Sequence, residues 1–307
     1  MGVMRLGYVH VRQSDLTTAT KHYSDTLGMT VMAEKPGQVF LKSWDEYDHH
    51  SVVLEEGGAG LVKMGYKCEK PEDIEEIEKK VLAFGCTVER MSAGENLAIG
   101  DGVRITLPSG HLVELYSEAE YVGHELGLLN PDVAPRNPIG VHVPRLDHAV
   151  ITAEEPEVIE RFFQECMGFK PAERVLGNEP KPELLGSFLF CSNTPHDFAV
   201  LKGPNNKLHH FAYTVQDWSD ILRGTRILVQ DDVRIDEGAT QHSVTRGTTT
   251  YFFDTSGNRN EIFAGGYTTF PDWRPITWTG DNLAKSIFYE DVPSSVELRW
   301  RSGEHQA

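Results

Sequence analysis

Two histidine positions and one glutamate in the second half of the chain are residue types that bind divalent metal ions. His148 lies in the run LDHAVI, His209 and His210 lie in LHHFAYTV, and Glu261 lies in GNRNEIF. Two neutral imidazoles and one carboxylate on adjoining strands form a facial triad, which leaves coordination positions open and suits non-haem Fe(II). Zinc hydrolases use the same ligand types, so the ligand set alone does not select the metal.

The adjacent histidines present a choice of ligand. Alternation along a strand directs His209 and His210 to opposite faces, and the strand pattern does not show which face is concave. Aligning the two halves of the chain pairs His210 with Tyr66, which favours His210. A single strand histidine is more commonly a hydrogen-bonded structural residue. Three such residues at matched positions of a repeat favour a metal site.

The first half of the chain has different residues at these positions. The aligned pairs are Tyr8 with His148, Tyr66 with His210, and Glu114 with Glu261, at offsets of 148−8=140, 210−66=144 and 261−114=147. A phenol with a usual pKa of about 10 stays protonated at neutral pH and is a poor metal ligand. We therefore predict that Glu261 binds metal and that Glu114 belongs to a half that does not.

The surrounding sequence predicts the elements that position these residues. RLGYVHV and RLDHAVI are alternating, strand-like runs, each followed by a helical pattern that ends at a glycine, Gly28 or Gly168. Two further strand-helix units begin near residues 63 and 207, which makes four units in all. The four prolines between residues 127 and 145 indicate a linker. The pattern predicts an α+β fold with mostly antiparallel sheets, divided into domains at 1–133 and 134–307.

Composition excludes several classes of function. The formal charge of −17 and the absence of a Lys/Arg cluster argue against a nucleic-acid partner. No apolar run reaches the roughly 18 residues of a membrane helix, and the N-terminus has no signal-peptide pattern, so we expect a cytoplasmic protein. The cysteines are scattered, which indicates buried free thiols: Cys68, Cys86, Cys166 and Cys191.

At these residues the sequence resembles the extradiol ring-cleavage dioxygenases, specifically the catechol 2,3-dioxygenase family. The resemblance covers nearly the whole chain, and the segments that carry it are GVMRLGYVHVR, LGLLNPD, RLDHAVI, KLHHFAYTV, TTYFFDTSGNRNEIFAGG and ITWTGDNLAKSIFY. It implies the vicinal oxygen chelate fold, in which each domain pairs two βαβββ modules and a sheet forms a half-barrel around the site. It also implies that the iron ligands are His148, His210 and Glu261.

The family's extradiol signature reads TQHSVTRGTTTYFFDTSGNRNE here, from Thr240 to Glu261. Two positions depart from it. Thr250 replaces an aliphatic residue before the tyrosine, and Thr255 replaces the proline of the turn, which the first half keeps as Pro108. Neither position is a ligand, so these departures bear on the rigidity of the turn more than on activity.

The resemblance also implies residues around the metal. His196 corresponds to the family's acid-base histidine, and His242 and Tyr251 correspond to residues that hydrogen-bond the substrate or dioxygen. Phe188, Val244 and Ile287 correspond to residues that line the pocket for the aromatic ring. Taken alone, His196 would be read as a surface-loop histidine after a Thr-Pro turn and Tyr251 as a core aromatic.

These observations predict Fe(II)-dependent extradiol cleavage of catechol or an alkyl-substituted catechol to a 2-hydroxymuconic semialdehyde, with dioxygen as co-substrate. Fe(II) is favoured over Mn(II), and the resemblance implies a homotetramer. The alternatives are a Mn(II) dioxygenase or glyoxalase-like isomerase on the same scaffold, and a protein that binds aromatic ligands without catalysis. The last alternative predicts the loss of a ligand residue, whereas all three stand here. A helix after Asp281 is expected to close over the pocket mouth.

Overall fold

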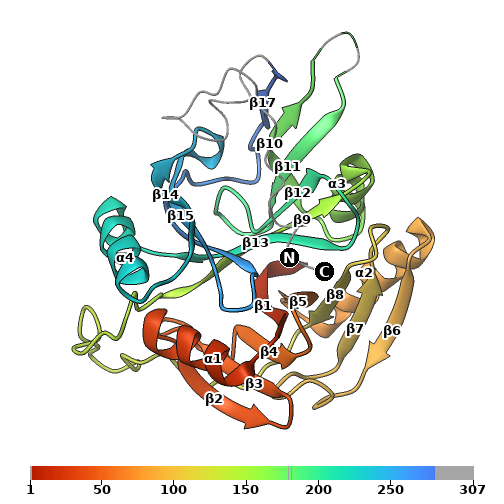
Figure 1. Cartoon of the computed structure of the whole chain (residues 1–307). Coiled ribbons are helices and arrows are strands. Elements are labelled where there is room, and N and C mark those ends of the chain that lie inside the picture. The colour runs from red at the N-terminus through yellow and green to blue at the C-terminus, as the bar shows by residue number, and fades with distance from the viewer. Residues whose placement is uncertain (1, 179, 181, 281–307) are drawn as a thin grey trace.

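The computed structural model describes residues 2–178, 180 and 182–280 of the chain. Its framework is two curved, mixed β-sheets, one from each half of the sequence (Figure 1). Each sheet contains two βαβββ modules, and the first strands of the two modules pair antiparallel at its centre. This arrangement confirms the predicted α+β class and the paired modules.

The N-terminal sheet has the strand order β2-β3-β4-β1-β5-β8-β7-β6. Pairing is antiparallel except between the first and last strands of each module, β1 with β4 and β5 with β8. The elements are β1 (Val3–Gln13), α1 (Leu16–Lys21), β2 (Thr30–Lys35), β3 (Gln38–Lys42), β4 (Val52–Glu56), β5 (Gly60–Cys68), α2 (Pro71–Phe84), β6 (Thr87–Met91), β7 (Gly102–Thr106) and β8 (Leu112–Tyr116).

The C-terminal sheet repeats this plan in the order β14-β15-β16-β13-β9-β12-β11-β10, with β17 added at the edge beside β10. Its elements are β9 (Arg145–Ala153), α3 (Pro156–Glu165), β10 (Lys170–Leu176), β11 (Leu184–Phe190), β12 (Phe198–Lys202), β13 (Lys207–Thr214), α4 (Trp218–Gln230), β14 (Ile235–Gln241), the 3₁₀ turn η2 (Val244–Arg246), β15 (Gly247–Phe253), β16 (Arg259–Gly265) and β17 (Ile276–Trp278). The linker prolines lie in the segment between β8 and β9.

Local sequence explains where the helices begin and end. Asp15 caps α1 by accepting a hydrogen bond from the Thr18 backbone N–H at 3.1 Å, and α1 continues into the π-helical turn η1 (His22–Thr26). Pro156 occupies the first turn of α3, where its missing N–H costs nothing. The predicted glycines after α1 and α3 both have a positive φ, near 75°.

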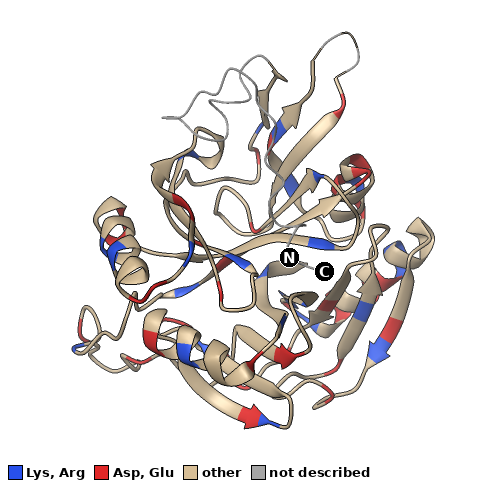
Figure 2. Ribbon diagram, in the orientation of Figure 1, with Lys and Arg blue, Asp and Glu red and all other residues tan. Residues whose placement is uncertain are grey.

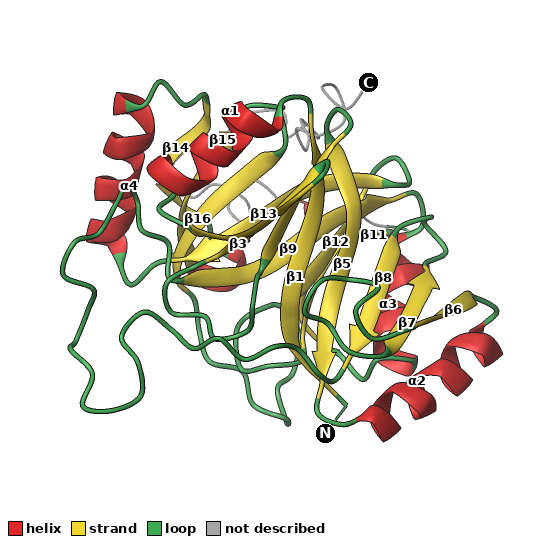
Figure 3. Cartoon of the chain, turned by 90° about the horizontal axis from the view of Figure 1, so that it is seen from below, coloured by secondary structure: helices red, strands yellow, loops and turns green. Residues whose placement is uncertain are grey.

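The helices pair across the two halves of the chain. Figure 3 shows α1 beside α4 at one side of the molecule and α2 beside α3 at the other. The Thr26 hydroxyl donates to Asp231 at 2.7 Å next to α4, and the Phe84 and Phe162 rings of α2 and α3 meet edge to face. The core continues through both halves between these helices and the sheets. This crossed pairing makes the two sheets a single packed unit.

A Ser-Gly turn precedes each buried glutamate, at Ser109–Gly110 and at Ser256–Gly257, and each turn docks against the opposite half. In the turn after β15, the Asn258 side chain accepts from the backbone N–H of Gly60 at 2.7 Å. In the turn after β7, the His111 ring contacts the carbonyl oxygen of Lys207 at 3.1 Å. Gly60 and Lys207 begin the corresponding strands β5 and β13. The repeated turn therefore locks the two halves together as well as preceding a glutamate.

Figure 2 shows charged residues of both signs on the helices and outer strands. Among the described residues no helix is both long and apolar enough to span a membrane.

Candidate metal centre

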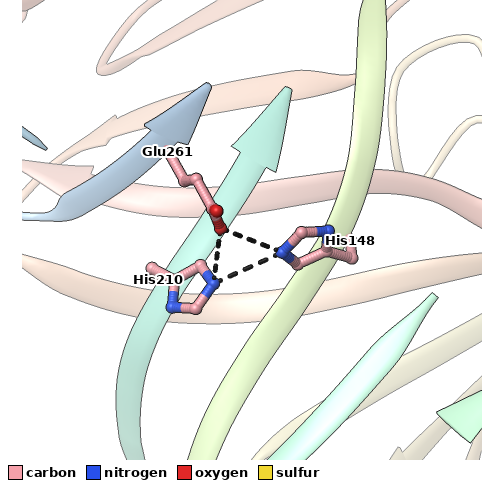
Figure 4. Close-up of side chains that lie close together, drawn as sticks. All are labelled: His148, His210 and Glu261. Atoms are coloured by element: carbon pink, nitrogen blue, oxygen red, sulfur yellow. Dashed lines mark hydrogen bonds and ion pairs between the residues drawn. The ribbon is translucent and has the colours of Figure 1, made fainter. Parts of the chain in front are cut away.

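The register of three neighbouring strands brings His148, His210 and Glu261 together. In the order β16-β13-β9, both Glu261 and His148 pair with Ala212, so they flank one residue of the middle strand. His210 lies two residues before Ala212 on β13 and therefore shares its face. Figure 4 shows the three side chains converging from these strands. All three are buried, with exposed fractions of 5% or less.

The three side chains form a compact set of ligand atoms. His148 Nε2 and His210 Nε2 lie 3.1 and 3.0 Å from Glu261 Oε2 and 3.3 Å from each other. Atoms about 2.1 Å from one ion, at angles between those of an octahedron and a tetrahedron, lie about 3.0–3.4 Å apart. The separations and the donor types therefore fit a single divalent ion.

The second nitrogen of each imidazole has its own partner. Nδ1 of His148 lies 2.7 Å from Asp147 Oδ2, and Nδ1 of His210 lies 2.6 Å from Nδ1 of His209. A proton held on Nδ1 leaves the Nε2 lone pair directed at the ligand cluster. His209, the alternative ligand in the sequence, thus lies behind His210, and a β-bulge between Leu208 and His210 sets this offset.

Both carboxylate oxygens of Glu261 have partners that fix their orientation. Oε2 faces the two imidazoles, while Oε1 accepts a hydrogen bond from the Thr249 hydroxyl on β15. Burial alone would raise the pKa of Glu261, but hydrogen bonds with His148 and His210 and the nearby His242 hold it well below its usual value. Against the effect of burial, hydrogen bonds to Asp147 and then to Glu261 raise the pKa of His148 to about 9, while burial lowers that of His210 to about 4.

His196 lies beside the cluster in the turn between β11 and β12. Its ring centroid is 3.9 Å from that of His148, and its Nδ1 has no hydrogen-bond partner among the described residues. Burial, followed by the neighbouring His148, lowers the pKa of His196 well below its usual value. Asp197 fixes the turn by accepting hydrogen bonds from the backbone N–H groups of Cys191 and Ser192. A buried, neutral imidazole is thus held at the edge of the candidate site.

Tyr251 and His242 also lie beside Glu261, and His242 Nε2 is 3.9 Å from its Oε1. Tyr251 pairs directly with Glu261 across β15 and β16, and its hydroxyl is 3.4 Å from His242 Nε2. Nδ1 of His242 donates to the Val244 carbonyl oxygen at 2.6 Å. Burial, then Glu261, raises the pKa of Tyr251 well above its usual value, so its hydroxyl stays protonated. Gly247 leaves room here, since a Cβ would lie 2.1 Å from the Phe263 ring.

The predicted pocket residues that the structure describes form an apolar cluster next to the ligands. Phe188 and Val244 pack with Val150, Val175 and Ala199. The Phe188 ring meets the His196 ring edge to face at 5.3 Å. Ile287 and the expected closing helix lie outside the described residues. A cavity of about 430 Å³ opens beside this cluster and is lined by Gln241, His242, Ser243, Arg246, Ile276 and Trp278.

The two departures from the extradiol signature have local explanations. The Thr250 hydroxyl faces α4 and is 2.7 Å from that of Thr225, so the polar replacement has a partner. The turn that contains Thr255 is fixed without proline. Asp254 there accepts hydrogen bonds from the Ser256 and Asn258 backbone N–H groups and from Tyr23 of the other half. Both replacements lie away from the ligand atoms.

One part of the sequence alignment was wrong. Gly65 on β5 pairs with both Tyr8 and Glu114, as Ala212 does with His148 and Glu261. His210 therefore corresponds to Lys63, two residues before Gly65, and not to Tyr66. Tyr66 faces the other side of the sheet, where its ring meets those of Phe163 and Phe169. The sequence alignment placed Tyr66 and His210 at an offset of 144 residues. The strand pairing shows that equivalent residues of β5 and β13 are separated by a constant 147.

Three supporting residues were not identified from the sequence: Asp147, Thr249 and Arg259. The Arg259 guanidinium lies 3.8 Å from the centroid of the Tyr251 ring and pairs with Asp236. Thr249 and Arg259 are two residues from Tyr251 and Glu261 respectively, so strand alternation places them on the ligand face. Asp147 directly precedes a ligand. These residues could therefore have been found from the sequence, by their adjacency to a ligand or by strand alternation.

Comparison with known proteins agrees with this geometry. Residues 63–120 match the "Catechol 2,3-dioxygenase-like N-terminal domain" model, and residues 145–262 match that of the "Glyoxalase/Bleomycin resistance protein/Dioxygenase superfamily". The metapyrocatechase of Pseudomonas sp. (strain CF600) is 39% identical, over 94% of this chain and 95% of that protein. The chain belongs to the metapyrocatechase family of extradiol dioxygenases.

Two solved structures of dioxygenases resemble this member of the metapyrocatechase family closely. The 2,3-dioxygenase LapB from Pseudomonas sp. KL28 has a TM-score of 0.88 and 38% identity, covering 92% of this chain and 99% of that one. Homoprotocatechuate 2,3-dioxygenase from Brevibacterium fuscum, in complex with 3,4-dihydroxyphenylacetate, has a TM-score of 0.85 and 27% identity, covering 95% and 90%. A manganese-dependent 2,3-dihydroxybiphenyl 1,2-dioxygenase from Geobacillus genomosp. 3 is 29% identical over 94% of this chain and 93% of that protein.

Proposed function

We propose that this protein catalyses Fe(II)-dependent extradiol cleavage of catechol or an alkyl-substituted catechol by dioxygen, giving a 2-hydroxymuconic semialdehyde. The observation that carries the proposal is the buried cluster of His148, His210 and Glu261, whose ligand atoms lie 3.0–3.3 Å apart. Its occurrence in a member of the metapyrocatechase family supports catechol cleavage over other metal chemistry.

The proposed ligands are His148, His210 and Glu261. Together they offer two neutral nitrogens and one negative charge, and they leave open the coordination positions that a catechol and dioxygen require. When bound, the metal would lower the first phenolic pKa of the substrate and bring both reactants to neighbouring positions. Asp147 and Thr249 would hold the ligands in place by the contacts described above.

His196 is the proposed acid-base residue. Its lowered pKa keeps the imidazole neutral at neutral pH, so it can accept a proton from a catechol hydroxyl. Its Nδ1 has no partner among the described residues, although it is buried in contact with a ligand and with the aromatic Phe188. Accepting a proton at Nδ1 would give this buried nitrogen a hydrogen-bonding role.

Tyr251 and His242 are the proposed residues that interact with substrate oxygen atoms. The protonated Tyr251 hydroxyl can donate a hydrogen bond to developing negative charge. His242 presents Nε2 toward the same space because its Nδ1 is occupied by the Val244 carbonyl oxygen. Phe188 and Val244 would pack against the ring of the catechol, and Ile287 stays a prediction because it lies beyond residue 280.

A direct experiment combines metal content with turnover. The purified protein, stripped of metal and reloaded under nitrogen with Fe(II) or Mn(II), should consume one dioxygen per catechol and form a yellow ring-opened product. We expect higher activity with Fe(II), and faster turnover with Mn(II) would assign the chain to the manganese type of its relative. Absence of oxygen uptake with both metals would contradict ring cleavage.

The wider setting of the enzyme is also a proposal. Family membership favours a homotetramer and a role in the cytoplasmic breakdown of aromatic compounds. The domain division at residue 133 is proposed from the linker, which joins the last strand of the first sheet, ending at Tyr116, to the first strand of the second, beginning at Arg145. Sedimentation of the purified protein would test the oligomer.

A further inference from the structure

Glu173 on β10 is a fully buried carboxylate that lies outside the residues assigned above. Three hydrogen bonds from separate segments converge on it. The Thr245 backbone N–H donates to Oε1 at 2.5 Å, the Tyr267 hydroxyl donates to Oε1 at 2.7 Å, and the Trp278 indole N–H donates to Oε2 at 2.5 Å. Hydrogen bonds to a carboxylate are strong, and losing the acceptor would leave buried donors unsatisfied.

The first of these bonds holds a strained turn next to the candidate site. Thr245 and Arg246 have φ values of 58° and 56°, which lie in the left-handed region that non-glycine residues rarely adopt. The same turn contributes the Val244 side chain to the apolar cluster, and the Val244 carbonyl oxygen fixes His242. The bond from Thr245 to Glu173 therefore stabilises a conformation that orients two of the proposed substrate-binding residues.

The bond from Trp278 holds a second segment that lines the cavity beside His242. Trp278 and Ile276 lie on β17, a three-residue edge strand that pairs only with β10 in the described sheet. Both residues line the 430 Å³ cavity together with His242 and Arg246. So short an edge strand has few backbone hydrogen bonds, and its attachment depends strongly on side-chain contacts.

Tyr267 extends this support to a third segment. Its ring stacks on that of Trp273 at 4.6 Å, and the Arg246 guanidinium lies 5.2 Å from its centroid. The Trp273 indole N–H donates to the Ala172 carbonyl oxygen, next to Glu173 in the chain. The segment that follows β16 is thereby tied to the strained turn and to β10 around one carboxylate.

We propose that Glu173 is a positioning residue that sets the width of the substrate cavity. It does so by holding the Val244–Arg246 turn and β17 at a fixed separation, and it thereby limits the size of the ring substituent that is accepted. The inference rests on the proposed function, because it assigns the cavity beside His242 to the catechol ring and its substituent.

The conservative variant Glu173→Gln tests this role. Its amide oxygen can still accept from Thr245 and Tyr267, but its NH₂ group then opposes the Trp278 N–H. We expect KM for catechol to rise about tenfold, the effect of one such hydrogen bond, while kcat stays within about threefold. The preference for 4-ethylcatechol over catechol should increase as β17 loosens. Metal content per chain should be unchanged.

Two further variants separate positioning from general stability. Trp278→Phe removes the N–H and keeps the apolar ring contact, so it should raise KM similarly. The double variant should show no further increase, because both changes break one bond. Glu160→Gln is the matched control: Glu160 is also buried and binds Arg174, the next residue of β10, with contacts of 3.0 and 2.5 Å. It should lower Tm without changing KM.

The proposal would be overturned by an unchanged KM and unchanged substituent preference in Glu173→Gln. An equal KM increase in Glu160→Gln, or additive effects of Glu173→Gln and Trp278→Phe, would also contradict it. Affinity for catechol measured by calorimetry under nitrogen gives a second readout, expected to fall about tenfold. If the metal-loaded parent protein consumed no oxygen, the proposed function would fail, while this binding measurement would still decide whether Glu173 shapes the cavity.

Discussion

Each sheet buries a glutamate, and the two sheets differ in how they compensate its negative charge. Each places a buried glutamate on the last strand of its second module, Glu261 in one sheet and Glu114 in the other, both with exposed fractions of 1% or less. In the C-terminal sheet the carboxylate faces two imidazoles. In the N-terminal sheet it faces Lys63 and Arg104 at 2.9 and 2.6 Å and also accepts a hydrogen bond from Tyr8.

Strand register makes this comparison position by position. Lys63 stands at the place of His210 and Tyr8 at that of His148. Arg104 pairs with Glu114 as Tyr251 pairs with Glu261. Burying a carboxylate requires a compensating charge. The N-terminal sheet provides that charge covalently, as lysine and arginine, whereas the C-terminal ligand set is suited to receive it as a metal ion.

The surroundings of the two glutamates have diverged much less. The His50 ring contacts Phe40 edge to face at 5.1 Å, and the His196 ring contacts Phe188 in the same way at 5.3 Å. The strand register places Phe40 at the position of Phe188 and His50 at that of His196. The framework of histidine and aromatic residues therefore persists in the sheet that has no such ligand set. What separates the two sites is the handful of side chains that compensate the glutamate.

The largest difference should appear when each glutamate is replaced by glutamine. Glu261→Gln removes the only charged ligand, so metal content should fall and activity should drop to that of the metal-free protein. Glu114→Gln should leave both unchanged and instead lower the free energy of unfolding by about 3 kcal/mol, because Lys63 loses its buried partner. Metal per chain, oxygen uptake and urea unfolding measure these outcomes. Normal metal content in Glu261→Gln would show that another carboxylate is the ligand.

The second largest difference should appear in kcat when the corresponding histidines, His196 and His50, are each replaced. His196→Gln should reduce kcat by about 10²–10⁴, the range for loss of a general acid-base group, while metal content is retained. His50→Gln should leave kcat unchanged, because it lies in the N-terminal sheet near Tyr8. Steady-state rates at saturating catechol, normalised to bound metal, provide the comparison. Equal kcat values in the two variants would remove His196 from the mechanism.

Lys63 tests whether a cation has replaced a metal in the N-terminal sheet. Lys63→Met keeps the aliphatic stem and should destabilise the protein by about 2–3 kcal/mol, somewhat less than full loss of a buried pair because Arg104 remains. Combining it with Glu114→Gln should cost less than the sum of the single changes, with a coupling of at least about 1 kcal/mol. Additive effects in urea unfolding would mean that Lys63 and Glu114 do not act as a pair.

Much of this contrast could be read from the sequence, and the rest depended on register. His148, Glu261 and the strand-helix repeats stand out because residue type and alternation are local properties. The structure places His210 in the cluster with His148 and Glu261, but the pairing with Tyr66 that favoured His210 is excluded by the strand register. A bulge at position 209 changes which residue faces the site, and a single sequence does not show where a strand bulges.

Contacts between distant segments were also beyond the sequence. Lys63 and Arg104 read as ordinary surface cations on strands, and only the pairing of β5, β7 and β8 brings them to Glu114. Glu173 reads similarly as one acidic residue in an alternating strand. Its three donors come from positions 72 to 105 residues further along the chain. Buried polar networks of this kind become predictable only once the topology is known.

The smallest expected effect concerns how His50 responds to acid. Burial, then the nearby His49, lowers the pKa of His50 from its usual value of 6.5 to about 3. Between these values the unfolded chain binds a proton at His50 that the folded protein does not, so stability falls as the pH falls below about 6.5. The slope from one such group is about 1.4 kcal/mol per pH unit. No contribution is expected above pH 7, where both states are neutral.

This dependence can be isolated by comparing His50→Gln with the parent protein in the metal-free state. Between pH 6 and pH 4.5 the parent should lose about 1–2 kcal/mol more unfolding free energy than the variant. Chelator in all samples prevents metal release from contributing, and histidines that do not interact with His50 cancel in the difference. His49→Gln is the matched control, because this neighbour is only partly buried and should alter the pH profile less. Parallel profiles for His50→Gln and the parent would mean that the folded protein protonates His50 readily, so the N-terminal framework would be more open to water than its burial indicates.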